Sequence, residues 1–429
     1  MARPGFVLEV DERTPPLLVH QGEGFRLQKF PLGSRVIYPP DSLPKLRGLR
    51  NHIRHALDHP HGSEPLRELL TPGMKLTIAI DDISIPLPPM QSPDIRQLVL
   101  EEVIELAARR GVEDVKLYMA NSLHRRMTAD EIKHAVGERV FRSFYPKDLK
   151  NHDAEDPENL AYVGKTDQGE EVEINKRAME SDLLIYVNIN LVAMDGGHKS
   201  VPVGLASYRS VKHHHNVHTT LPSKSYMDPR PGRSAIHDSC RRMGDVLKAN
   251  GLKVFTIETT MNNNTFPDPF GFMNKREWEW SLVEQGTYLA AKKANDVGPS
   301  AMKHQIWTRI KSPAGVTGIV AGDTDAVHEQ TLATLHRQQL VEVDGQSDIM
   351  VVGLPYICPY NVNSIMNPIL VHCLGLGYLF NLYRNKPVVR PGGAMIMFHP
   401  VPNEFHQVHH PSYVDFFEEV LTETTDPST

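Results

Sequence analysis

The sequence predicts an α/β fold of two domains, each with a mostly parallel sheet flanked by helices. Two observations support it: short apolar segments that suit buried strands alternate with longer segments of helical periodicity, and the chain has 429 residues, more than one hydrophobic core usually organises. Parallel strands need a crossover connection, which a helix usually supplies. Ligands bind such sheets outside the carboxyl ends of the strands. We therefore expect the active site there, in the cleft between the domains.

Local patterns predict the elements of the first half, after a β-rich or irregular approach segment over 1–60. The apolar runs "MKLTIAIDD", "EDVKLYMAN" and "SDLLIYVNINL" have the length and composition of buried strands. Thr128, with Glu131 three residues later, is the capping-box pattern of a helix start. The predicted strands cover 74–82, 113–121 and 181–191; the predicted helices cover 64–70, 95–112 and 128–140; a helix–strand unit covers 244–260.

The chain divides into three parts by pattern. Residues 1–261 form an N-terminal domain, and 315–429 form a C-terminal α/β domain. The segment 262–314 breaks the alternation and holds all three tryptophans. It is either an insertion that serves as a subunit interface or an active-site lid, or a folded connector. The predicted C-terminal elements are a helix over 323–339, a strand over 347–355, a helix near 361–377 and a strand within 391–401.

Composition indicates a globular protein and disfavours several classes. Hydrophobic residues make up 40% and charged residues 23% of the chain, and the formal net charge of −6 argues against a nucleic-acid binder with a broad basic surface. No apolar run reaches about 18 residues, and the N-terminus lacks the layout of a signal peptide. We therefore expect a cytoplasmic protein without membrane partners. The three cysteines form no CxxC pair, which disfavours zinc-ribbon and thioredoxin-type sites.

Polar residues follow each of the three predicted core strands. The first strand ends at Asp81 and Asp82, the second runs into Asn121 and His124, and the third runs into the stretch 196–216. Parallel strands bring these ends to one edge of the sheet. A histidine base, with a carboxylate to orient it, is what proton abstraction requires. Asp82 and His124 are the candidates for these roles.

The stretch "GGHKSVPVGLASYRSVKHHHN" combines glycines, a lysine and histidines. Gly196 and Gly197 permit close backbone approach, and Lys199 can hold a phosphate or act as a nucleophile when desolvated. On a strand, adjacent histidines would face opposite sides, so that only some of them could share a metal. The alternative is a solvated basic loop. The histidines concerned are His213, His214, His215 and His218.

Motifs over most of the chain outside 262–314 resemble the nickel-pincer lactate racemase family of 2-hydroxyacid racemases and epimerases. They are "HGSEPLRELLTPGMKLTIAIDDISIP", "ANSLHRRMTADEI" and "SDLLIYVNINLVAMDGGHKSVPVGLASYRSVKHHHN", and more weakly "SDIMVVGLPYICPYNVNSIMN" and "VVRPGGAMIMF". The resemblance implies that 1–261 is the cofactor-binding domain. It also implies proton-coupled hydride transfer, in which a histidine takes the hydroxyl proton while the C2 hydride moves to the cofactor.

The resemblance assigns roles to individual residues. Lys199 matches the lysine that holds the cofactor, a pyridinium-3,5-bisthiocarboxylic acid mononucleotide, through a thioamide link. His215 matches the histidine ligand to nickel, whose other donors belong to the cofactor. His124 matches a catalytic histidine and Asp82 the aspartate near it. The implied cofactor contacts also include Ser84, Gly196, Gly197 and His198.

Several substrate-handling positions depart from the family. The second catalytic histidine corresponds to Ile189, and the arginine three positions after the aspartate corresponds to Ile85. The family's glutamine–lysine substrate contacts fall near Met366 and Ile369. An apolar residue cannot replace an arginine that binds a carboxylate. The candidates to take over substrate contacts are Arg125, Arg209, His214, His218, Asn188 and Asn190.

The expected function is a nickel-pincer-dependent racemase or epimerase of a 2-hydroxy acid or sugar acid. The alternatives are a nickel-pincer hydride-transfer enzyme that does not racemise, a non-catalytic metal or nucleotide binder on the same scaffold, and a mononuclear metal hydrolase using the histidine cluster. The expected partners are the small-molecule hydroxy acid and the cofactor-biosynthesis enzymes. Homo-oligomerisation is left open.

Overall fold

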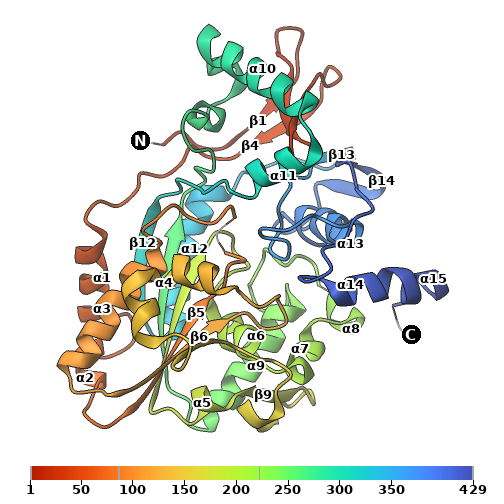
Figure 1. Ribbon diagram of the computed structural model, residues 1–429. Coiled ribbons are helices and arrows are strands. Elements are labelled where there is room, and N and C mark those ends of the chain that lie inside the picture. The colour runs from red at the N-terminus through yellow and green to blue at the C-terminus, as the bar shows by residue number, and fades with distance from the viewer. Residues whose placement is uncertain (1, 86, 222, 428–429) are drawn as a thin grey trace.

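The computed structural model describes residues 2–85, 87–221 and 223–427, and a six-stranded sheet forms its centre (Figure 1). The strand order is β12-β11-β10-β5-β6-β7. Neighbouring strands are parallel except β12, which pairs antiparallel with β11. The strands are β5 (Lys75–Asp81), β6 (Asp114–Ala120), β7 (Leu149–Asn151), β10 (Leu183–Asn190), β11 (Val254–Met261) and β12 (Val316–Gly322). The predicted α/β class and its three core strands are confirmed.

Strand β10 lies in the middle of the sheet, and all eight of its residues are buried. Its alternate side chains enter two different cores: Ile185 and Ile189 one, Leu184 and Tyr186 the other. Burial on both faces explains why this strand reads as an uninterrupted apolar run. The first core contains α1 (Leu49–Asp58), α3 (Ile95–Arg109) and α4 (Ala129–Phe144), and the second contains α6 (Ser200–Gly204) and α9 (Ala235–Ala249).

Strand β12 shows that the large sheet extends past residue 315. It pairs with β11 from Thr256↔Gly322 to Met261↔Val316, and α12 (Thr324–Gln339) packs on both strands. The division proposed from the sequence put β12 and α12 in the C-terminal domain, whereas the sheet joins them to the first 261 residues. Local sequence patterns cannot predict this pairing. It depends on hydrogen bonds between β12 and the edge of β11, which lie far apart in the sequence.

The segment 262–314 packs against the N-terminal strands and forms the narrow upper lobe in Figure 1. Its side chains Phe272, Trp280 and Tyr288 form one cluster with Leu18 and Phe25. The segment is therefore an integral part of a small folded unit. The elements of this lobe are β1 (Phe6–Glu9), β2 (Leu17–His20), β3 (Phe25–Gln28), β4 (Arg35–Tyr38), α10 (Leu282–Val297) and α11 (Ser300–Trp307).

The C-terminal part is built on a second, two-stranded parallel sheet. Its strands are β13 (Ser347–Gly353) and β14 (Val389–Phe398). The predicted helix near 361–377 begins later, as α13 (Pro368–His372), and continues as a π-helical segment over Cys373–Leu379. Asn367 caps α13 by accepting from the Leu370 N–H.

The remaining elements are short. They are α2 (Leu66–Leu69), β8 (Leu160–Lys165), β9 (Glu171–Asn175), α5 (Lys176–Met179), α7 (Tyr208–His214), α8 (Val217–Thr220), α14 (Pro411–Asp415), a π-helical turn over Phe416–Val420, and α15 (Leu421–Glu423). Within the described ranges, no helix is both long and apolar enough to cross a membrane.

Candidate functional site

The carboxyl ends of β5, β6 and β10 meet at one edge of the sheet, as the sequence predicts. Asp81 at the end of β5 pairs in register with Ala120 at the end of β6, and Ile80 pairs with Val187 near the end of β10. The loops that follow these strands carry Asp82, His124 and Lys199. This register brings residues more than 100 positions apart in the sequence to one edge.

Asp82 and His124 form a hydrogen-bonded pair. His124 Nδ1 lies 2.8 Å from Asp82 Oδ2, and Ser84 N donates to Asp82 Oδ1 at 2.9 Å. Burial alone would raise the pKa of Asp82, but His124 and the Ser84 hydrogen bonds hold it below its usual value. The carboxylate therefore fixes the ring through its Nδ1–H and leaves Nε2 as the free nitrogen. His124 is 27% exposed, and its ring meets the edge of Tyr360 at 5.2 Å.

A buried arginine, which the sequence analysis did not identify, holds the loop that carries Asp82. Arg96 is 1% exposed and pairs with Asp94 at 2.8 Å. Its guanidinium also donates to three carbonyl oxygens, those of Asp81, Asp82 and Ile85. The only signal in the sequence is a charged residue in the first turn of the predicted helix, directly after a buried position. Arg96 thus fixes the position of Asp82 through its hydrogen bonds to the backbone of the loop.

Replacing Arg96 with alanine should destabilise the protein by about 3–5 kcal/mol, because the buried Asp94 carboxylate and the three carbonyls lose their partner. Urea denaturation followed by circular dichroism measures the loss. The matched control is Arg109→Ala at the exposed end of the same helix, for which we expect a change within about 0.5 kcal/mol. Equal stability of the two variants would contradict the role of Arg96.

Asp81 is half-buried beside the pair and differs from Asp82 in the direction of its pKa shift. Burial, strengthened by the negative charge of Asp82, raises its pKa to about 8, against the hydrogen bond from the Ile189 N–H at 2.7 Å. The folded protein therefore holds Asp81 protonated at pH values where the unfolded chain releases the proton. This group contributes stability below about pH 4, and the contribution is lost as the pH rises toward 8.

An Asp81→Asn variant should remove this pH dependence, since the amide is neutral and keeps an oxygen for the Ile189 N–H. Relative to the wild type, its free energy of unfolding should rise by about 1.4 kcal/mol per pH unit between pH 5 and 7.5. Urea denaturation of both proteins at pH 5 and at pH 7.5 measures the difference in their free energies of unfolding. The exposed Asp167→Asn variant should show no such trend, and parallel pH profiles for wild type and Asp81→Asn would refute the assignment.

The glycine pair shapes the loop that carries Lys199. Gly196 has a φ of 79° and Gly197 a φ of 60°, and a Cβ on Gly196 would collide with Asn190 and Glu258. Gly197 N donates to the buried Glu258 carboxylate at 2.7 Å. The loop therefore lies so close to β11 that only glycine fits at position 196.

Lys199 is partly buried at the end of this loop. Its Nζ donates to the Met194 carbonyl at 3.3 Å, and within the described part of the chain it forms no ion pair. His198, by contrast, pairs with Asp325 on α12 at 2.9 Å. A second residue missed by the sequence analysis is His237, which is buried near this lysine: its Nδ1 lies 2.8 Å from Ser234 Oγ, its Nε2 has no hydrogen-bond partner among the described residues, and burial lowers its pKa to about 3.

The triple histidine lies at the end of a helix and not on a strand, so its side chains project about 100° apart. His213 turns toward Glu171, at 3.9 Å, and His214 is fully buried. His215 is solvent-exposed although protein surrounds it, which is the situation of a residue lining an open cleft. Desolvation in this position is the main cause that lowers its pKa, and the positive charge of Lys199 adds to the effect. Lys199 and His124 are thus among the charged groups near His215.

Three amide side chains at this edge have unpaired buried atoms, within the described residues. They are Asn121 Oδ1, Asn188 Nδ2 and Asn190 Oδ1. Asn188 lies beside the lysine loop, because its Oδ1 accepts from Ser200 Oγ at 2.7 Å. Unpaired buried amide atoms are costly unless a ligand or water completes them. They are free to hold polar groups of a nucleotide or substrate.

Other candidate substrate residues are placed differently. Arg125 is committed to the Glu131 carboxylate and the Val362 carbonyl, and it joins the two parts of the chain at the cleft. Arg209 is exposed and lies over the Tyr208 ring. Ile189 is fully buried in the hydrophobic core. The structure therefore offers neither a guanidinium nor an imidazole from these positions.

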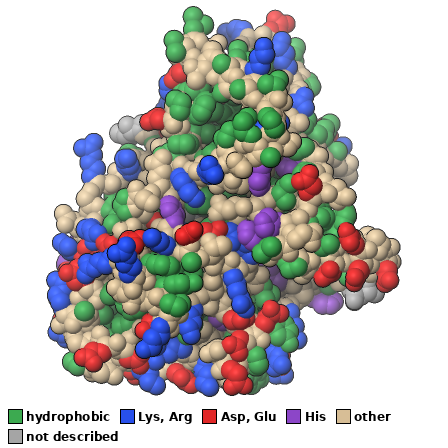
Figure 2. All heavy atoms as spheres, in the orientation of Figure 1, with side chains coloured by type: hydrophobic (Ala, Val, Ile, Leu, Met, Phe, Trp, Pro, Cys, Tyr) green, Lys and Arg blue, Asp and Glu red, His purple; other side chains and the backbone are tan. Residues whose placement is uncertain are grey.

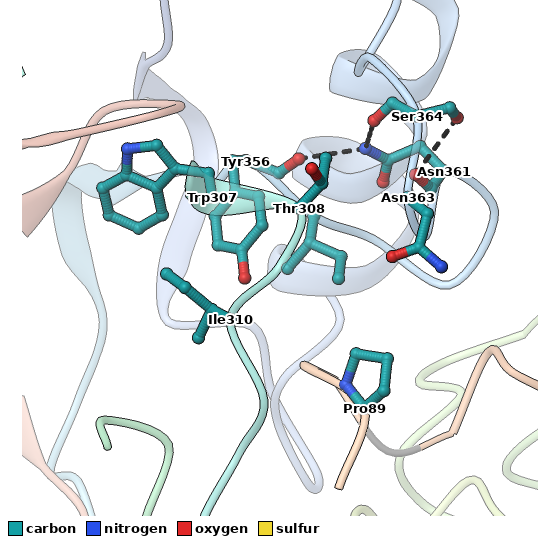
Figure 3. A pocket seen from close by; sticks show the side chains of 9 residues that line it. Pro89, Trp307, Thr308, Ile310, Tyr356, Asn361, Asn363 and Ser364 are labelled. Atoms are coloured by element: carbon teal, nitrogen blue, oxygen red, sulfur yellow. Dashed lines mark hydrogen bonds between the residues drawn. The ribbon is translucent and has the colours of Figure 1, made fainter. Parts of the chain in front are cut away.

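A hollow near the interlobe junction lies apart from the pair (Figure 3). It is lined by Pro89, by the end of α11 with Thr308 and Ile310, and by the loop 356–364, which Asn361 ties together through hydrogen bonds to Tyr356 and Ser364 carbonyls. It is too narrow for a substrate and holds no acid–base pair. Histidine side chains gather instead on the middle of the face in Figure 2, between the upper lobe and the larger body.

Comparisons with known proteins agree on one family. Residues 24–227 match the lactate racemase N-terminal domain. Lactate racemase of Thermoanaerobacterium thermosaccharolyticum is 29% identical over 167 residues, which are 38% of this chain and 37% of that protein. Lactate racemase of Lactiplantibacillus plantarum is 28% identical over 168 residues, 38% of each chain. The matched part thus spans less than half of the curated relatives.

One solved structure extends the likeness of fold. The lactate racemase apoprotein from T. thermosaccharolyticum aligns over 89% of this chain and 73% of that chain, with a TM-score of 0.55 and 17% sequence identity. The likeness therefore covers the C-terminal part as well as the matched domain.

Proposed function

We propose that the chain, whose residues 24–227 match the lactate racemase N-terminal domain, is a divergent relative of the lactate racemases and an isomerase that inverts a hydroxyl-bearing carbon. The substrate class is a 2-hydroxy acid or a sugar acid. The observation that carries the proposal is the Asp82–His124 pair at the same sheet edge as Lys199. This arrangement provides a proton acceptor next to an anchoring amine.

The residues present fit the nickel-pincer nucleotide. Lys199 forms no ion pair among the described residues, His215 is exposed, and the amides of Asn121, Asn188 and Asn190 have unpaired buried atoms at this edge of the sheet. Lys199 would hold the nucleotide and His215 its nickel. When bound, this cofactor supplies the group that accepts and returns a hydride.

The protein's own share is proton transfer and orientation. His124 Nε2 takes the proton from the substrate hydroxyl, while Asp82 keeps the ring in one tautomer and stabilises the imidazolium. Arg96 keeps the Asp82 loop in place while His124 gains its positive charge. Tyr360 contacts the His124 ring in a T-shaped arrangement, which restricts the positions that the ring can take.

Substrate specificity should differ from that for lactate. Ile85 and Ile189 leave two polar positions of the family without polar side chains, and Arg125 is already engaged by Glu131. A small carboxylate would therefore bind poorly here. A larger acid with further hydroxyl groups suits the row of asparagine amides better.

The burial of Ile189 favours a second candidate function, hydride transfer with proton transfer on one face only, without racemisation. The non-catalytic binder remains a further outcome of the same test. The hydrolase alternative lacks a ligand set in the described ranges, where no three His, Cys, Asp or Glu side chains gather closely enough to hold a metal ion.

The test is to produce the chain together with cofactor-making enzymes and to measure nickel content, the UV–visible spectrum and intact mass. The loaded protein is then incubated with single enantiomers of 2-hydroxy acids and sugar acids, and products are separated by chiral chromatography. We expect a mass adduct on Lys199, bound nickel and the opposite configuration. Accumulation of the keto acid alone would favour the second candidate; absence of both adduct and nickel would refute the proposal.

A further inference from the structure

His214 connects His215 to the protein interior through a chain of hydrogen bonds. Its Nε2 lies 3.2 Å from the Pro202 carbonyl oxygen, and its Nδ1 lies 2.7 Å from Nδ1 of His215. His215 Nε2 makes no hydrogen bond among the described residues. The two rings stand nearly perpendicular, with centroids 4.8 Å apart.

The direction of each bond follows from the chemistry of the atoms. A carbonyl oxygen only accepts, so His214 Nε2 carries a hydrogen and donates to Pro202. His214 is fully buried and has no carboxylate partner in the described chain, so a charged ring would be costly and it is neutral. Its Nδ1 is then the acceptor, and His215 Nδ1 must donate.

We propose that His214 is a positioning residue that fixes the tautomer of His215, so that its Nε2 lone pair points to the ligand site. This rests on the proposed function only where the ligand is nickel. The chain Pro202–His214–His215 orients the ring and leaves Nε2 unprotonated, the state in which histidine binds a metal. His214 therefore acts through His215, in place of the substrate contact that the sequence suggested.

Two variants separate this role from simple packing. In His214→Asn the amide oxygen takes the place of Nδ1 and can still accept from His215. In His214→Gln the amide group takes the place of Nε2, so the bond to Pro202 survives and the bond to His215 is lost. The control is His213→Asn, at the neighbouring half-buried position, whose ring lies toward Glu171 and makes no hydrogen bond to His215 among the described residues.

The first readout needs no cofactor. Long-range ¹H–¹⁵N spectra of the unloaded protein, with the His215 signal assigned by its loss in His215→Gln, report which ring nitrogen carries the hydrogen. We expect the Nδ1–H tautomer in wild type, in His213→Asn and in His214→Asn, and a mixture in His214→Gln. An Nε2–H tautomer in the wild type, or no change in a folded His214→Gln variant, would overturn the proposal whatever the protein's activity.

The second readout concerns the metal. Protein loaded by co-expression is challenged with EDTA, and nickel per chain and Lys199 adduct mass are followed together. We expect His214→Gln to retain nickel about 10–100-fold less tightly, with an unchanged adduct mass, and His214→Asn to recover most of the affinity. If no variant or wild type carries nickel, the proposed function fails while the tautomer result still decides the role of His214.

Discussion

A His124→Gln variant is expected to lose about 10²–10⁴-fold in kcat while its Lys199 adduct remains in place. The reason is geometric: Asp82 holds Nδ1 of His124 at 2.8 Å, and Nε2 is the free nitrogen that can take a proton from a substrate hydroxyl. Glutamine preserves much of the side-chain volume but has no basic nitrogen. The measurements are steady-state turnover on the substrate found in the panel and intact mass of the same preparation.

Companion variants identify the cause of the loss. Asp82→Asn should reduce kcat by up to about 10⁴-fold, because the amide stabilises neither the imidazolium nor the required tautomer. His52→Gln, on the exposed face of α1, should leave kcat unchanged. Full turnover in the His124 variant would remove this residue from proton transfer, and a lost adduct would show that it serves attachment.

The second large effect concerns the anchor. Lys199→Ala should abolish the covalent adduct completely, because no other amine takes the position of the loop that Gly196 and Gly197 press against β11. Lys199→Arg should give the same result, since a guanidinium keeps the positive charge but is not a nucleophile at neutral pH. Peptide mapping by mass spectrometry, on protein co-produced with the cofactor-making enzymes, measures the adduct.

The control for this experiment is Lys212→Arg, an exposed lysine on α7 that precedes the histidines. Its adduct should remain at the wild-type level. An adduct that persists in Lys199→Ala would place the attachment elsewhere. Nickel bound to Lys199→Ala without any adduct would show that non-covalent contacts and His215 suffice to hold the cofactor.

Much of the fold could be predicted from local patterns. The apolar run of β10 and the helical periodicity of α3 and α4 persist in the structure, because burial of a sheet between two helix layers leaves a direct imprint on the sequence. The pairing of Asp82 with His124 could also be predicted, since polar residues at the ends of parallel strands must meet.

The three histidines show where such reasoning stopped. A strand would alternate their directions, whereas the end of helix α7 leaves His213 half-buried near Glu171, buries His214 and exposes His215. A segment of 7 residues with polar and apolar positions mixed fits either pattern. The role of His214 toward His215 then depends on contacts with Pro202, which lies 12 positions earlier.

The sequence by itself determined the central strands and helices of this protein, the loop with Gly196, Gly197 and Lys199, and the meeting of Asp82 with His124, because each is encoded in a short pattern or in the rule for parallel strand ends. Only the tertiary structure decided that β12 closes the large sheet, that Arg96 supports the Asp82 loop and that Ile189 is core. These depend on contacts between distant segments, where burial and hydrogen-bond partners are set by packing and leave no local pattern.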